Sequence, residues 1–260
     1  MPNELNCDAI IAGGARIADE IGIFMPQEHL RRRLRGQGLH IKGNRVHIEQ
    51  KAFYAFLADW RADDARGKFV NRGSGDQFAR YNGTINEYCT NLLDPDTGKY
   101  APFTLQSLLA ATQLTVHLCK TYEKRCNVVG QPCDVPAQLQ SLARYYIAAQ
   151  ACPGDFPGEP SSLAAADYLF AMAELMGEPI TRLSVYASSP LTLGGDSVEI
   201  AVRNIHRVSQ VKVTSMPALG CTAPLSIPHA LSCALAEAMG GAVIMSALCG
   251  RPCDFLVQMH

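Results

Sequence analysis

The sequence predicts an α/β protein, an incomplete TIM (β/α)8-type barrel of about four to five βα units behind a mixed α+β N-terminal region. Strand-like and helical segments alternate in the second half of the chain, which is typical of a parallel sheet. Roughly 140 residues follow the first 120, whereas a complete barrel needs roughly 250. The last segment is an apolar strand without a covering helix, although parallel sheets are covered on both faces. We therefore expect an N-terminal extension over residues 1–120 and a partial barrel over residues 121–260.

The N-terminal region combines short elements of both kinds. Apolar spacing of about four residues predicts the helices, and alternation of apolar and polar residues predicts the strands. The expected elements are a helix over 15–24, a hairpin of strands 39–42 and 45–48 around Gly43-Asn44, a helix over 50–61, an extended stretch over 68–93 and a turn over 94–98. Pro95 and Gly98 favour that turn because proline fixes φ and glycine permits a positive φ.

The barrel region is predicted from start and stop signals. Ser161 or Ser162 can cap a helix that Gly177 ends, and Asp196 with Glu199 forms a capping pattern at the start of another. The expected elements are helix 104–120 with Thr104 as its cap, strand 126–130, helix 137–151, a brief strand within 153–160, a helix from 161 or 162 to 176, strand 180–187, a helix from 196, strand 211–216, helix 226–249 and strand 254–258. An open doubly wound sheet is the alternative fold, but no glycine-rich nucleotide-binding motif follows a predicted strand.

Composition excludes several classes of protein. Lys and Arg total 23 against 24 Asp and Glu, so no basic field is available to bind nucleic acid. The ten cysteines are spread along a chain whose first residues lack a secretory signal, which favours free thiols in the cytoplasm. Residues 230–249 are apolar enough to cross a membrane, but they lack aromatic belts and flanking basic residues. We expect a buried helix there.

Several short motifs occur in a consistent order along the chain, and one of them is Pro217-Ala-Leu-Gly-Cys-Thr-Ala-Pro224 before an alanine-rich helix with Ala236-Glu237. With these motifs the sequence resembles the trimethylamine methyltransferase family over essentially its whole length. The other motifs are Glu20-Ile-Gly22, Asp94 with Thr97-Gly98, Thr104-Leu105, Val129-Gly-Gln-Pro132 with Asp134-Val-Pro136, and Ser188-Ser-Pro-Leu191.

The resemblance implies a TIM barrel behind an N-terminal extension, and family members are longer than this chain. It therefore implies that the sixth to eighth barrel strands are missing, together with the region in which the trimethylamine enzymes carry pyrrolysine. The implied reaction transfers a methyl group from trimethylamine, or from a quaternary amine such as glycine betaine, to Co(I) of a corrinoid protein. The cofactor belongs to that partner protein, and the chain itself is expected to bind no cofactor directly.

Candidate substrate-binding residues follow from the expected strand ends, since barrel enzymes place their sites on the loops there. Aromatic faces and carboxylates suit a quaternary cation, and backbone N–H groups at a helix entry suit a substrate carboxylate. The candidates are Asp134, Ser188, Ser189, Gly220 and Thr222, with Tyr88 and Phe156 as possible aromatic contacts. Each has a structural alternative: Asp134 can cap the helix near Pro136, and the two serines can form a turn. The Gly220–Thr222 segment can be a tight turn into the long helix, with Ser226 as the helix cap, and the aromatic residues can pack.

No catalytic residue can be assigned, because the nucleophile of the implied reaction is the corrinoid cobalt. Cys249 and Cys253 lack the two further ligands of a zinc site, so no metal site is expected. Two other functions stay open: an inactive fragment that acts only as a binding or assembly module, and a different, complete α/β enzyme. A homo-oligomer is compatible with the sequence.

Overall fold

The computed structural model describes residues 5–34, 36, 38–65, 89–94, 96–121, 130–151 and 159–259. The chain divides into two compact units. The first unit combines residues 1–71 with residues 182–260, and the second contains residues 72–181. The predicted boundary at residue 120 falls within the second unit, and it stays a prediction.

A seven-stranded mixed sheet forms the centre of the first unit. Its strands, in spatial order, are β2 (Leu39–Lys42), β3 (Arg45–Ile48), β1 (Ile23–Phe24), β7 (Thr192–Leu193), β6 (Arg182–Ser188), β8 (Gln210–Ser215) and β9 (Asp254–Val257). Strands β6, β8 and β9 are parallel neighbours, which confirms the parallel βαβ pattern. Strand β7 turns back antiparallel to β6, and β1 runs parallel to β7. The sheet curls like half of a barrel.

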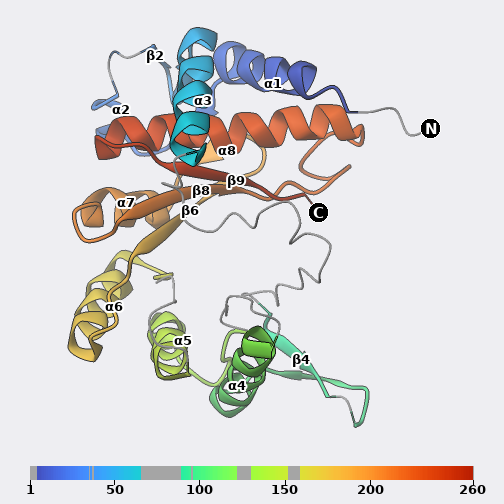
Figure 1. Ribbon diagram of the computed structural model, residues 1–260, viewed down its shortest axis with the longest axis vertical. Coiled ribbons are helices and arrows are strands. Elements are labelled where there is room, and N and C mark those ends of the chain that lie inside the picture. The colour runs from blue at the N-terminus through green and yellow to red at the C-terminus, as the bar shows by residue number, and fades with distance from the viewer. Residues whose placement is uncertain are drawn as a thin grey trace. The chain divides into compact units, whose positions relative to one another are not determined.

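Helix α8 (Ile227–Cys249) covers one face of this sheet (Figure 1). Gly241 allows the close approach, since a Cβ there would lie 2.9 Å from Cγ1 of Val213. The helix is long and apolar enough to cross a membrane, but 72% of its most apolar window is buried inside the protein. It is the core helix that the sequence predicts. Helix α7 (Asp196–Asn204) connects β7 to β8 and packs on β6.

Helix α1 (Cys7–Arg16) packs along α8 (Figure 1) and continues through one π-helical turn, η1 (Ile17–Ile21). A Cβ on Gly13 would meet Oγ of Ser232 at 2.6 Å, so glycine sets the distance between the two helices. The predicted helix over 15–24 is therefore wrong at both ends. The helix begins earlier, and Gly22, with φ of +76°, ends it before Ile23 and Phe24 enter the sheet as β1.

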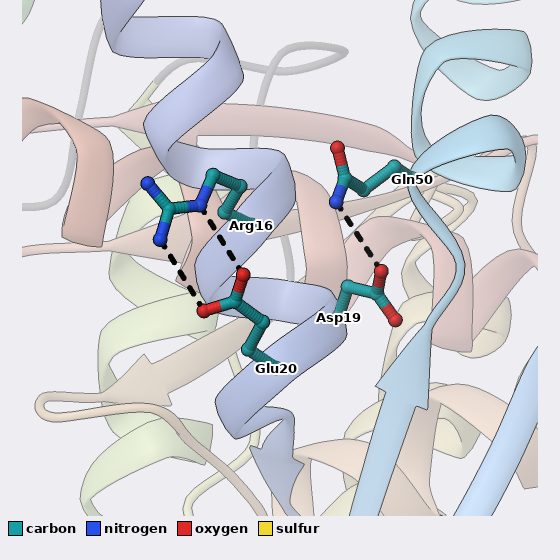
Figure 2. A network of polar contacts seen from close by, with 4 residues as sticks. All are labelled: Arg16, Asp19, Glu20 and Gln50. Carbon is teal, nitrogen blue, oxygen red and sulfur yellow. Dashed lines mark hydrogen bonds and ion pairs between the residues drawn. The ribbon is translucent and has the colours of Figure 1, made fainter.

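Polar contacts join η1 to the start of helix α3 (Gln50–Ala65) (Figure 2). Arg16 pairs with Glu20 at 3.2 Å on the exposed surface, and Nε2 of Gln50 donates to Asp19 at 3.4 Å. The pairing with Glu20 raises the pKa of Arg16. Exposed ion pairs of this kind contribute little to stability.

The far end of α3 reaches β9. The indole N–H of Trp60 donates to Asp254 at 3.0 Å, and its ring lies 4.7 Å from the ring of Phe255. Trp60 is the only tryptophan of the chain. Its fluorescence therefore reports on the first unit.

In its described residues the second unit has a hairpin and three helices: β4 (Asn91–Leu93), β5 (Tyr100–Pro102), α4 (Leu105–Thr121), α5 (Ala137–Ala151) and α6 (Leu163–Met176). The predicted turn over 94–98 is confirmed, because the amide of Gly98 donates to the carbonyl of Asp94 at 2.8 Å. Backbone N–H groups of Asp96 and Thr97 donate to the Asp94 carboxylate and lower its pKa. The predicted ends of α6 are also confirmed, with Ser162 as its N-cap and Gly177 left-handed after it.

Three short segments remain: one helix, and two strands that the sequence predicts. Helix α2 (Glu28–Arg31) is a single turn before β2. The predicted strand over 126–130 and the brief strand within 153–160 lie almost entirely outside the described residues.

Candidate functional site

The parallel strands β6, β8 and β9 end together at one edge of the sheet. Register places Ala187 of β6 opposite Ser215 of β8, and Ser215 opposite Val257 of β9. The loops that start at Ser189 and Met216 leave from this edge. In α/β proteins with parallel strands, ligands bind at the carboxyl ends of the strands, so this edge is the candidate site.

A buried carboxylate connects these strand ends. Glu237 is the only acidic residue of α8, and it is 1% exposed. Its carboxylate accepts hydrogen bonds from the hydroxyl of Ser189 at 2.6 Å and from the hydroxyl of Ser215 at 2.5 Å. A third bond comes from the backbone N–H of Leu191 at 2.9 Å. The end of β6, the end of β8 and the loop after β6 therefore meet at one side chain.

Hydrogen bonds, and not an ion pair, stabilise this carboxylate in the described part of the chain. None of the ion pairs found there includes Glu237. Burial of an ionised carboxylate costs several kcal/mol unless its oxygens are paired, and bonds from O–H and N–H donors to an ionised acceptor are among the stronger ones. The arrangement therefore fixes the position of the loop relative to α8.

The loop after β6 has an unusual backbone. The peptide bond between Ser189 and Pro190 is cis, and Leu191 has a φ of +49°. Leu191 is buried, its N–H binds Glu237, and its carbonyl accepts from the amide of Phe24 at 2.8 Å. A positive φ in a non-glycine residue persists only where the surroundings hold it, and such residues gather at functional sites. Glu237 is one of the groups that hold Leu191.

The loop between β8 and α8 is closed by its own bonds. The amide of Gly220, where φ is +71°, donates to the carbonyl of Ala223 at 2.9 Å. The amide of Thr222 donates to the carbonyl of Ala218 at 3.0 Å, and its hydroxyl accepts from the amide of Ala218 at 2.9 Å. The segment is a tight turn beside the site, and a substrate contact from Gly220 or Thr222 stays a prediction.

Comparison with known families identifies the chain. The family model for trimethylamine methyltransferase (MTTB) matches residues 2–254. The chain belongs to the trimethylamine methyltransferase family. This confirms the family resemblance seen in the sequence motifs. No curated protein matches the chain.

In this family member the structure brings together only some of the predicted site residues. Ser188 is exposed at the end of β6, and Ser189 beside it donates to Glu237. Both lie at the candidate site, although the Ser189 hydroxyl already donates its hydrogen bond to Glu237. Their contact with a substrate stays a prediction. Tyr88 and Phe156 lie outside the described residues.

Asp134 lies in the second unit and has a structural partner there. Its carboxylate accepts a hydrogen bond from the backbone N–H of Leu105 at 2.8 Å. Beside it, the hydroxyl oxygen of Thr104 accepts the backbone N–H of Ser107 at 3.1 Å. Asp134 therefore caps the start of α4, whereas the capping alternative from the sequence placed it on the helix after Pro136. The substrate contact predicted for Asp134 stays a prediction.

Two predicted helix caps differ from the sequence patterns. The N-cap of α7 is Gly195, with no side-chain cap, and Asp196 and Glu199 lie in the first turn. Ser226 is the N-cap of α8, but its hydroxyl contacts Nδ1 of His229 at 2.9 Å instead of capping a backbone N–H.

Two thiols lie at the end of α8, the partly buried Cys249 and the buried Cys253. A hydrogen bond from Cys253 lowers the pKa of Cys249, with a further contribution from Arg251. The same bond and burial raise the pKa of Cys253 well above its usual range. No group of three or more His, Cys, Asp or Glu side chains that could hold a metal ion occurs among the described residues.

Sequence reasoning did not assign a site role to Glu237 or Ser215. A signal for Glu237 was present, because a single carboxylate within a long apolar helix must find hydrogen-bond donors. No sequence signal identified those donors, since they come from residues 22 to 48 positions away.

Proposed function

We propose that this chain contributes the substrate-binding part of a methyltransferase that acts on methylated amines. The proposed methyl donor is trimethylamine or a quaternary amine such as glycine betaine, and the proposed acceptor is Co(I) of a corrinoid bound to a separate protein. The observation that carries the proposal is the family match over residues 2–254. The family implies methyltransferase activity on methylamines.

The structure supports the location of this activity. We treat β6, β8 and β9 as consecutive strands of a TIM-type barrel, because they are parallel neighbours joined through helices. The active sites of such barrels lie at the carboxyl ends of the strands. That edge of the sheet is where Ser188, Ser215 and the Glu237 carboxylate lie.

In this reaction the role of the protein is to position the substrate. The acceptor supplies the nucleophile: its electron pair forms the new bond to the methyl carbon, the C–N bond breaks, and the electron pair of that bond stays on the departing amine. A quaternary donor therefore leaves as a neutral tertiary amine, and trimethylamine that reacts as its protonated trimethylammonium form leaves as neutral dimethylamine. The chain needs to hold the ammonium group in line with the approaching acceptor and to exclude other orientations. Such a role fits a loop fixed by Glu237 and needs no nucleophile from the protein.

The remaining parts of the proposal concern the location of the protein, its partner, its oligomeric state and a second candidate function. We place the protein in the cytoplasm with a corrinoid protein as its partner, and a homo-oligomer is compatible with this role. A binding or assembly module without catalytic activity is the second candidate. It is favoured by the place of β9 as the last strand of the described sheet, where Leu256 is 36% exposed. Open strand edges pair readily with other chains.

An anaerobic methyl-transfer assay separates these functions. The protein is mixed with cob(I)alamin, or with a corrinoid protein reduced to Co(I), and with one methylated amine at a time. Formation of methylcobalamin, followed by its absorbance, together with the demethylated amine, supports the methyltransferase. Dimethylamine is the expected product from trimethylamine, and dimethylglycine is the expected product from glycine betaine. Binding of an amine without formation of either product supports the binding module.

A further inference from the structure

Two cysteines meet where helix α8 ends and strand β9 begins. Cys249 is the last residue of α8, and Cys253 lies directly before β9. Between them Gly250 has a φ of +67°, the left-handed conformation in which a glycine ends a helix. The backbone N–H of Cys253 donates to Oγ of Ser246 at 2.9 Å. Because Ser246 and Cys249 are three residues apart, they share one face of α8, and the chain returns to that face at Cys253.

The side chains of the two cysteines are in contact. The S–H group of Cys253 donates a hydrogen bond to the sulfur of Cys249, and Sγ of Cys253 also lies 3.8 Å from the carbonyl oxygen of Arg251. Both thiols are free. A disulfide requires an S–S distance of about 2.05 Å, so the sulfurs must move closer together. Gly250 leaves the connecting segment room to adjust, since a Cβ there would meet nothing within 4 Å.

Access and charge distinguish the two thiols. Cys249 is only partly buried, whereas Cys253 is 1% exposed. Arg33 reaches the same helix end, where it donates to the carbonyl of Leu248 at 3.1 Å. The hydrogen bond from Cys253, followed by the charges of Arg251 and Arg33, lowers the pKa of Cys249, while burial opposes this shift. Cys249 is therefore the thiol that meets solvent with more thiolate character, and Cys253 is a second thiol held beside it.

We propose that Cys249 and Cys253 form a peroxide-reactive site that closes to a reversible disulfide. Cys249 is the thiol that reacts with hydrogen peroxide, and Cys253 is the thiol that resolves the product. An accessible thiolate with a second thiol beside it is typical of redox-sensing cysteines in reducing compartments. The proposal goes beyond methyl transfer, because it needs neither an amine nor a corrinoid protein.

The oxidation proceeds in two balanced steps. The sulfur of Cys249 attacks one peroxide oxygen, the O–O bond breaks, and the departing hydroxide takes the Cys249 proton as water. Cys249 is then a sulfenic acid. The sulfur of Cys253 attacks the sulfur of Cys249, the S–O bond breaks, and the departing hydroxyl takes the Cys253 proton as a second water. Two thiols are thus oxidised to one disulfide, and one hydrogen peroxide is reduced to two waters.

Differential alkylation of the full chain after treatment with hydrogen peroxide tests the site. Free thiols are blocked with N-ethylmaleimide in denaturant, disulfides are then reduced, and the released thiols are labelled with iodoacetamide for peptide mass spectrometry. Peroxide is expected to bring Cys249 and Cys253 together into the iodoacetamide-labelled fraction, and dithiothreitol before the blocking step is expected to return both to the blocked fraction. Iodoacetamide on neither thiol, or on only one of them, overturns the proposal.

The rate of the first step gives a second readout. At about pH 7, loss of the Cys249 thiol to peroxide is expected to be at least about threefold faster than loss of an ordinary exposed thiol, since more of Cys249 is thiolate. Cys221 is the internal comparison, because it is exposed in the loop before α8. Faster loss of Cys221 than of Cys249 overturns the proposal.

Substitutions separate the two roles. Cys249→Ser is expected to abolish oxidation of Cys253, because the buried thiol has lost the partner that reacts with peroxide. Cys253→Ser is expected to stop the reaction at the sulfenic acid, so dimedone labels Cys249 in this variant and much less in the unmodified protein. Cys221→Ser is the matched control and is expected to leave the disulfide unchanged. Equal dimedone labelling of Cys249 with and without Cys253 overturns the proposal.

A measurement on the unmodified protein covers the case in which a serine variant fails to fold. The tryptic peptide that holds Cys249 and Cys253 also contains Cys221 and Cys233, so fragment ions of the unreduced peptide must locate the bond. A mass lower by two hydrogens and a bond between Cys249 and Cys253 are expected after peroxide treatment. An unchanged mass, or a bond that joins Cys249 to another cysteine, overturns the proposal.

Discussion

The hydroxyl of Ser189 at the end of β6 donates a 2.6 Å hydrogen bond to Oε2 of Glu237 in the middle of α8. This bond joins a strand end to the core helix across 48 residues of chain. Because the carboxylate also binds Ser215 and the amide of Leu191, it holds two strand ends and one loop in a fixed relation. Glu237 is therefore a positioning residue for the candidate site.

Replacement of Glu237 with glutamine is expected to lower the free energy of unfolding by about 1–3 kcal/mol. The amide keeps the shape of the side chain, but its NH2 group faces donors where the carboxylate offered an acceptor. Denaturant unfolding followed by the fluorescence of Trp60 measures the effect within the same unit. Glu20→Gln is the control, since its pair with Arg16 is exposed and pairs of this kind contribute little to stability. Equal effects of the two substitutions would contradict the role of Glu237.

Gly241→Ala is expected to destabilise the first unit by about 1–3 kcal/mol despite the better helix propensity of alanine. The new Cβ would lie 2.9 Å from Cγ1 of Val213, within the sheet that α8 covers. The comparison is Gly240→Ala, where the nearest atom is the flexible end of Ile48 at 3.2 Å. Trp60 fluorescence in denaturant gives both values. A larger loss at Gly240 than at Gly241 would show that α8 does not pack as described.

The two thiols at the end of α8 are expected to differ in reactivity. Because the bond from Cys253 lowers the pKa of Cys249, Cys249 carries more thiolate at a given pH and is alkylated with a midpoint below that of an ordinary thiol. Cys253, whose pKa is raised, is expected to stay unmodified over the same pH range. Iodoacetamide labelling with peptide mass spectrometry measures both midpoints.

The Cys253→Ala variant tests whether the hydrogen bond from Cys253 lowers the pKa of Cys249. Loss of the donating S–H group is expected to move the alkylation midpoint of Cys249 upward, while the exposed Cys7 on α1 keeps its own midpoint. An unchanged midpoint for Cys249 in this variant rules out the hydrogen bond as the origin of its lowered pKa.

Asp134 variants distinguish a helix cap from a substrate contact. Asp134→Ala removes the acceptor of the Leu105 amide and is expected to cost α4 about 1 kcal/mol, seen as roughly fivefold faster hydrogen exchange at Leu105. Asp134→Asn keeps an acceptor oxygen and is expected to keep most of the protection. A carboxylate that binds an ammonium group would be lost in both variants, so weaker binding of an amine by both identifies a substrate contact.

Local signals were sufficient for much of the fold. Ser162 and Gly177 mark the ends of α6 because a side-chain cap and a left-handed glycine act within a few residues. The same is true of the Asp94 turn and the β2–β3 hairpin. The parallel order of β6, β8 and β9 followed from alternating elements, since a crossover helix brings successive strands together.

The elements and contacts that the sequence did not predict depend on pairing between residues far apart in the chain. Ile23 and Phe24 sit in a sequence with helical spacing, but Gly22 ends the helix and pairing with β3 and β7 makes them a strand. The two-residue β7 carries too short a pattern to predict. The candidate site shows the same difference between local and non-local signals. Ser189 was named as a candidate because it follows a predicted strand. The hydrogen bond from Ser215 to Glu237 could not be predicted, because it depends on how α8 packs on the sheet.

The central claim is that a methylated amine binds at the carboxyl ends of β6 and β8, beside the loop that Glu237 fixes. The most direct measurement is titration of the isotope-labelled chain with glycine betaine, followed by the chemical shifts of its backbone amides. We predict that the largest changes occur at Ser188 to Thr192, at Ser215 and Met216, and at Phe24. Saturable changes confined to residues 89–181, with none at these strand ends, would contradict the account.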